Sequence, residues 1–104
     1  MTTFDDREKA FEDKYKHDQE LQFRVEVRRN KLLGLWAAEL LGKDDAEAYA
    51  KEVVSADFEE PGDADLVRKL LGDFQDGGVE MSEHRLRNKM EDCLAAAKEQ
   101  VMAE

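Results

Sequence analysis

The sequence predicts an all-α fold, an antiparallel four-helix bundle with an N-terminal extension that is helical or frayed. Two observations favour helices: apolar residues recur at spacings of three and four, and one proline with six glycines in 104 residues is too few for an all-β fold. A chain of this length supports one hydrophobic core. We expect two parts, an N-terminal segment over residues 1–20 and a bundle over residues 21–104.

The first expected helix, residues 3–20, is densely charged and carries few apolar side chains. Phe4, Phe11 and Tyr15 have the spacing i, i+7, i+11, so they form one narrow aromatic stripe. At ideal pitch this stripe is rotated by about 60–100° from the core face of the next helix. Burying three aromatic rings yields roughly 15 kcal/mol gross, which the entropy of ordering the segment offsets. We therefore expect a marginal or frayed helix unless something covers the stripe.

The second expected helix spans residues 21–41 and ends at Gly42, a residue type that favours the position after a helix. Its predicted core face contains Leu21, Val25, Leu32 and Trp36, with Leu35 and Leu40 at the flanks.

The third expected helix spans residues 44–56, and its acidic start predicts an N-cap with a capping-box acid. An acidic loop over residues 57–62 follows, where Pro61 and Gly62 stop the helix.

The last two expected helices span residues 63–75 and 82–103, with Asp63 and Ser82 as N-caps. The pair Gly77–Gly78 separates them. Because the connections are short, we expect successive helices to run antiparallel.

Composition and charge exclude several classes of protein. Sixteen Lys and Arg against 26 Asp and Glu give a net charge of −10, which argues against general affinity for nucleic acid. No apolar run reaches the roughly 20 residues of a membrane span, and the N-terminus lacks the regions of a signal peptide. The single Cys93 cannot form an internal disulfide. We expect a cytoplasmic protein.

No strong catalytic or metal-binding constellation is present. His17 and His84 lie in different charged segments without a Cys or His at metal-ligand spacing, so we expect both to be exposed. Cys93 lies on the apolar face of the last helix and is interpreted as a buried residue. Gly77–Gly78 lacks the Lys-Ser/Thr of a phosphate loop, and the carboxylates of residues 57–65 lack the spacing of a calcium loop. We interpret them as a solvated acidic surface, and predict no enzyme, no metal and no required cofactor.

Two features have alternative interpretations. The basic run Arg24, Arg28, Arg29 and Lys31 is either a solvated face that pairs with carboxylates or a site for a nucleotide phosphate or an acidic partner. The aromatic stripe either folds back onto the bundle or is a ligand that inserts into a groove of a partner.

Two stretches of the sequence are distinctive. They are Phe4-Asp5-Asp6-Arg7-Glu8 at the start and Arg28-Arg29-Asn30-Lys31-Leu32-Leu33-Gly34-Leu35-Trp36-Ala37 in the second expected helix. Together with the length, the acidity, the helix order and the Gly77–Gly78 turn, they resemble the zeta subunit family, small inhibitors of the F-type ATP synthase in alphaproteobacteria. The resemblance covers the whole chain.

The resemblance implies a four-helix bundle whose N-terminal segment enters a catalytic α/β interface of the ATPase head and blocks rotation in the hydrolysis direction. The implied partners are the α and β subunits, with γ as a further contact, and the free chain would be a monomer. By position, Phe4, Phe11 and Tyr15 would be apolar anchors, and the polar contacts would be Asp5, Asp6, Arg7 and Glu12.

The resemblance also implies ADP or ATP as a regulatory ligand of the bundle, for which Arg28, Arg29 and Lys31 are the candidates by charge. Through the ATP synthase the chain would be peripheral to the inner face of the bacterial membrane. Two alternatives remain open at this point: a nucleotide-binding regulatory bundle, and a helical adaptor that acts through its acidic surface around residues 57–65.

Overall fold

The computed structural model describes residues 3–57 and 62–104, and within these ranges the side chains from Asp6 onward. In this part of the chain five α-helices and no strands are found, which confirms the all-α prediction. The antiparallel four-helix arrangement stays a prediction. The helices are α1 (Thr3–His17), α2 (Gln19–Leu41), α3 (Ala46–Ala56), α4 (Ala64–Asp76) and α5 (Glu83–Ala103).

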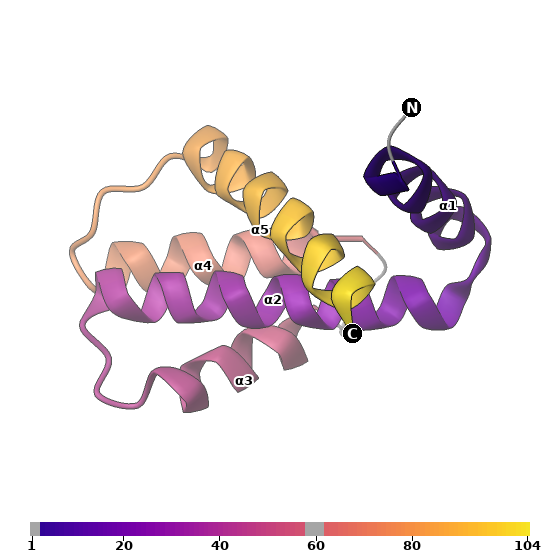
Figure 1. Cartoon of the computed structure of the whole chain (residues 1–104). Coiled ribbons are helices and arrows are strands. Elements are labelled where there is room, and N and C mark those ends of the chain that lie inside the picture. Colours follow the sequence, from indigo (N-terminus) through magenta and orange to yellow (C-terminus); the bar gives the residue numbers. More distant parts are fainter. Residues whose placement is uncertain (1–2, 58–61) are drawn as a thin grey trace.

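The helix α2 is central, because it packs against α1, α3 and α5, while α4 packs against α3 and α5. In Figure 1, α5 crosses α2 obliquely, and α1 turns back from the beginning of α2 toward the end of α5. We call α2–α5 together the helical body.

Local capping residues define most of the helix boundaries as predicted. The Ser82 side chain accepts a hydrogen bond from the Arg85 backbone N–H at 3.0 Å, and Asp45 caps α3 in the same way. The predicted capping box of α3 is wrong, because the residue three positions after this N-cap is Ala48 and not an acid. Gly42 ends α2 with φ of +68°, a left-handed conformation that suits glycine. Asp63 occupies the N-cap position of α4 without a capping hydrogen bond from its side chain. The predicted loop over residues 57–62 lies mostly outside the described residues, because residues 58–61 are not described.

The boundary between the first two helices lies at Asp18 rather than near residue 20. Asp18 has φ −109° and ψ 102°, and its carboxylate accepts a hydrogen bond from the backbone N–H of Leu21 as the N-cap of α2. The Gln22 amide donates to the carbonyl oxygen of Tyr15 at 2.7 Å. A break of one residue therefore turns α1 back, so that Phe11 and Tyr15 face the helical body instead of pointing away from it.

The buried face of α2 is wider than the pattern predicted. Leu21 and Val25 are buried as expected, but Leu32 and Trp36 are only partly buried and Leu40 is 39% exposed. The reason is that α2 is covered on more than one side, so several small or unpredicted positions become inaccessible. The buried positions of α2 absent from the predicted face are Asn30, Leu33, Gly34, Ala37 and Ala38.

The buried residues that the structure describes form two clusters. The larger one joins α2, α3, α4 and α5, and in it the Trp36 and Phe74 rings meet edge to face with centroids 5.7 Å apart. The smaller one lies beneath α1 and contains Leu21, Val25, Ala97 and Val101.

Candidate functional site

The candidate site is the contact between α1 and the helical body. Phe11 and Tyr15 are partly buried and pack against the smaller core cluster, and their rings are stacked with centroids 6.4 Å apart. In the free chain Phe11 and Tyr15 of the aromatic stripe thus fold back onto the body, one of the two expected outcomes. We call the surface that receives it the α1 patch, which consists of Leu21, Val25, Leu94, Ala97 and Val101.

A cation of α5, Lys98, reaches α1 beside this patch. The Lys98 ammonium lies 3.2 Å from a carboxylate oxygen of Glu12 and 4.5 Å from the centroid of the Tyr15 ring. Both contacts are attractive, one as an ion pair and one as a cation–π interaction. Two of the predicted site residues, Glu12 and Tyr15, therefore share one basic partner.

The other predicted site residues of the N-terminal segment are either exposed or have side chains outside the described residues. The Asp6 and Arg7 side chains are exposed on α1. The Phe4 and Asp5 side chains lie outside the described residues, so the structure places their backbone in α1 and no more.

Two of the three predicted anion-binding residues line one groove between α2 and α5. Arg28 and Lys31 contribute to a groove of about 220 Å³. Both Arg24 and Arg28 form ion pairs there with the Glu104 side chain. The hydrogen bond from Arg28 lowers the pKa of Glu104 below its ordinary value. The groove is lined by Phe23, Arg24, Val27, Arg28, Lys31, Val101 and Glu104.

The third predicted anion-binding residue, Arg29, points to a different side of α2. Its guanidinium donates to Asn30 at 2.8 Å and lies 3.4 Å from Asp57, while the Asn30 amide donates to Asp57 at 2.8 Å. Successive helical residues are about 100° apart, which separates Arg29 from the groove beside Arg28. The structure does not bring the three cations together.

The interpretation of residues 57–65 as a solvated acidic surface is wrong at two positions. The side chains of Asp57 and Asp65 are only 8% and 9% exposed. Asp57 is covered because it joins the α3 end to Arg29 and Asn30 on α2. Fewer carboxylates of this region are therefore available to bind a partner than the adaptor hypothesis assumed.

The remaining titratable candidates lie where the sequence predicted. Cys93 is buried, and burial raises the pKa of its thiol above the ordinary value. His17 and His84 are exposed. Among the described residues, no group of three metal-ligating side chains is found, and no helix is long and apolar enough to span a membrane.

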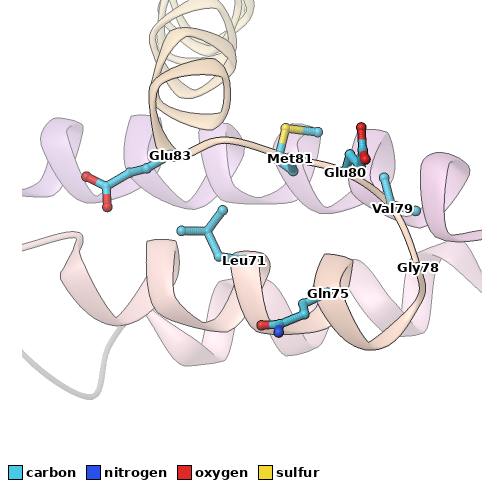
Figure 2. A pocket seen from close by; sticks show the side chains of 7 residues that line it. All are labelled: Leu71, Gln75, Gly78, Val79, Glu80, Met81 and Glu83. Carbon is cyan, nitrogen blue, oxygen red and sulfur yellow. The ribbon is translucent and has the colours of Figure 1, made fainter.

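A cavity of about 480 Å³ lies between α4 and the segment that leads into α5. In Figure 2, Leu71 and Gln75 of α4 form one side and the extended segment with Met81 forms the other. Its rim carries Glu80 and Glu83, of which Glu83 pairs with Arg87. No predicted site residue lines this cavity.

Sequence reasoning missed Lys98 and placed Phe23 in no site. Lys98 contacts Glu12 from 86 positions away, and no local spacing signals a contact of that range. Arg24 and Arg28 are one helical turn apart, so their spacing alone predicts that they share one face of α2.

The comparison with protein families agrees with the resemblance. A comparison with curated proteins gave no match. A structure solved by solution NMR is similar to this chain, with 52% sequence identity and a TM-score of 0.70, covering 80% of this chain and 96% of that one. The sequence profile of the family described as ATPase inhibitor subunit zeta matches residues 1–100. The chain therefore belongs to the ATPase inhibitor subunit zeta family.

Proposed function

We propose that this protein inhibits ATP hydrolysis by the catalytic head of the F-type ATP synthase, and that α1 is its inhibitory element. In this proposal α1 inserts as a helix at a catalytic α/β interface and prevents the movement that each hydrolytic cycle needs. The γ subunit is a further contact. The observation that carries the proposal is that α1 presents an aromatic face on a helix joined to the body by one non-helical residue.

The arrangement suits a helix that binds in a groove of a partner. Phe11 and Tyr15 would be apolar anchors once α1 leaves the α1 patch, and Phe4 would extend the same stripe. The polar contacts would come from charged residues of the segment, Asp5, Asp6, Arg7 and Glu12. Charged rims around an apolar centre are typical of such interfaces.

The helical body would stay outside the interface and limit how far α1 enters. The proposed division places the inhibitory segment in residues 1–20 and the body in residues 21–104, with the structural break at Asp18. A body that also touches the head would raise the effective concentration of α1 at its site. Such a role needs no catalytic group on this chain, which favours a regulatory protein rather than an enzyme.

The test is ATP hydrolysis by an isolated alphaproteobacterial ATPase head, titrated with the full chain and with a chain that begins at Asp18. Starting at Asp18 keeps the N-cap of α2, and circular dichroism checks that the shorter chain is folded. We expect inhibition by the full chain alone. Equal inhibition by both chains would place the inhibitory site on the body and overturn the proposal.

A double variant localises the effect within α1. Replacing Phe11 and Tyr15 by alanine should abolish inhibition, because both anchors are lost. The matched control replaces Lys9 and Lys14, two exposed residues of α1, by alanine. Since alanine also favours a helix, we expect the control to inhibit like the unmodified chain.

A second candidate function is regulation by an adenine nucleotide bound in the groove between α2 and α5. The observation that favours it is that Arg24, Arg28 and Lys31 line this groove together, and that both arginines already bind a carboxylate there, that of Glu104. Guanidinium groups bind phosphate as they bind carboxylate. Bound nucleotide would compete with the Glu104 carboxylate for both arginines.

Titration with ADP, followed by NMR chemical shifts, tests this candidate. Saturable shifts around Phe23 and Arg28 are expected, and Arg28→Ala should weaken binding. Arg68→Ala is the matched control, because Arg68 is an exposed arginine of α4. Shifts that are absent, or that sodium pyrophosphate reproduces in full, would remove the adenine-specific site.

A further inference from the structure

We propose that Lys98 is a positioning residue that holds α1 closed on the helical body, so that the body competes with the ATPase for one aromatic face. This inference rests on the proposed inhibitory role of α1 and adds its regulation. The α1 patch would then be an intramolecular receptor, and Lys98 would set how often α1 is released from it.

The geometry around Lys98 supports a clamp. Its ammonium lies 3.2 Å from the Glu12 carboxylate and 4.5 Å from the Tyr15 ring centroid. Glu12 and Tyr15 are three positions apart, one helical turn, so one cation reaches both. The Lys98 side chain is only 24% exposed, because it lies against α1.

Lys98 is also the principal polar link between α1 and the rest of the protein. Among the side chains that the structure describes, Lys98–Glu12 is the sole ion pair from α1 to the helical body. Among the described side chains, Gln22 is a further polar link, since its amide donates to the carbonyl oxygens of Tyr15 and Lys16 at the break between the helices. The apolar contacts that the structure describes are those of Phe11 and Tyr15 with the α1 patch.

Closure and inhibition exclude each other because they use the same side chains. Tyr15 and Glu12 face Lys98 when α1 is closed, and both belong to the surface proposed to enter the ATPase interface. When only the open fraction binds, the apparent dissociation constant equals the intrinsic one divided by that fraction. Weakening the clamp should therefore strengthen inhibition, whereas loss of a contact with the ATPase would weaken it.

The experiment compares the full chain with three variants. Lys98→Met removes the charge and keeps an unbranched apolar side chain, while Lys98→Arg restores a cation that can bind a carboxylate and an aromatic ring. Lys89→Met is the matched control: Lys89 also lies on α5 over an aromatic ring, at 5.6 Å, but that ring is Trp36 of α2 and not a residue of α1. Amide hydrogen exchange of residues 6–17 and the midpoint of ATPase inhibition are measured for each.

We expect Lys98→Met to speed exchange in α1 and to lower the inhibitory midpoint by about three- to tenfold, the size of a partly exposed cation–π contact plus an ion pair. Lys98→Arg and Lys89→Met should resemble the unmodified chain in both measurements. Unchanged exchange in Lys98→Met would show that Lys98 does not hold α1. Faster exchange with an equal or higher midpoint would show that closure does not compete with inhibition.

The two proposals fail in different ways. If the unmodified full chain does not inhibit the head, the inhibitory role and the competition both fall, and the exchange data still report whether Lys98 closes α1. If the full chain inhibits but Lys98→Met does so no better, the inhibitory role stands and the competition is overturned.

Discussion

The Tyr49 hydroxyl donates a hydrogen bond to the Asp73 carboxylate at 2.7 Å, which joins α3 to α4. Tyr49 is 4% exposed, and its burial, aided by the carboxylate, raises the pKa of its hydroxyl far above the ordinary value. Burial alone would raise the pKa of Asp73, but hydrogen bonds from Tyr49 and Lys69 outweigh it and lower this pKa. Each group therefore keeps its ordinary charge at neutral pH: the Tyr49 phenol is neutral and the Asp73 carboxyl is ionised.

We predict a loss of stability in alkali that depends on Tyr49. Above a pH of about 10 an unfolded tyrosine loses its proton while native Tyr49 keeps it. The unfolded state then binds fewer protons, so the free energy of unfolding falls as pH rises. Urea unfolding from pH 8 to 11 should show this fall, and Tyr49→Phe should flatten it while costing about 1 kcal/mol at pH 7. An equally steep alkaline loss in Tyr49→Phe would assign the effect to another group.

We predict opposite effects for two helical glycines. A Cβ on Gly34 of α2 would lie 2.7 Å from the Ala50 Cα of α3, so Gly34→Ala should force the helices apart and cost about 1–3 kcal/mol. The control is Gly72→Ala in α4, where a Cβ meets nothing within 4 Å. There alanine should stabilise by about 0.5–1 kcal/mol, because glycine loses more backbone entropy. The thermal unfolding midpoints of both variants test this prediction. A stabilising Gly34→Ala would contradict the close approach of α2 to α3 at Gly34 and Ala50.

Local signals account for the parts of the fold that the sequence predicted. Ser82, Asp45 and Gly42 act within one helical turn, and such caps can be recognised from neighbouring residues alone. Asp18 acts in the same local way, but no glycine or proline marks its position. The sequence therefore predicted the boundary between the first two helices near residue 20 instead of at Asp18. The break forms because α1 gains contacts with the α1 patch, and that gain is not local.

The same distinction explains the candidate site. The alignment of Phe11 and Tyr15 follows from helical spacing, so the stripe was predictable. Its partner Lys98 was not, because that contact depends on how α5 crosses α2. The buried positions of α2 were misjudged for a related reason, since a helix covered on several sides has no single apolar face.

We predict that Asn30 is essential for stability. It is 0% exposed, accepts a hydrogen bond from Arg29 and donates one to Asp57. Asn30→Ala would remove one hydrogen-bond partner from each of Arg29 and Asp57, whose side chains are largely buried. This loss should lower the free energy of unfolding, measured in urea, by about 2–3 kcal/mol. Asn88→Ala, at an exposed position of α5, is the control and should change stability by less than about 0.5 kcal/mol. If Asn30→Ala also costs less than about 0.5 kcal/mol, the hydrogen bonds of Asn30 with Arg29 and Asp57 contribute little to stability.

We predict that the Cys93 thiol reacts only when the protein opens. The side chain is 6% exposed, and burial raises its pKa, so little thiolate is available at neutral pH. Labelling by a thiol-specific chromogenic disulfide should be slow in the native protein and fast in urea. Fast native labelling would place Cys93 in an accessible site. Cys93→Ala, which lacks the thiol, gives the background.

The last prediction concerns the break between α1 and α2. The Asp18 carboxylate accepts the Leu21 N–H at 3.1 Å only because α2 begins there; in one continuous helix that N–H would bond to the carbonyl of His17. Asp18→Ala therefore removes an interaction of the closed form and adds a better helix former, worth together about 1–1.5 kcal/mol. Relative to the unmodified chain, we expect the ratio of straight to closed molecules to rise by about five- to tenfold. The mean radius of gyration should then exceed the 14.9 Å of the closed chain.

Small-angle scattering and the NMR contact between Tyr15 and Lys98 measure this opening. Asp45→Ala is the matched control, because Asp45 caps α3 through an equivalent hydrogen bond of 3.0 Å. There the left-handed Gly42 ends the preceding helix, so α2 and α3 cannot merge and only stability should fall. If Asp18→Ala keeps the Tyr15–Lys98 contact and the compact radius, the α1 patch closes the helix by itself and the cap contributes nothing to the break.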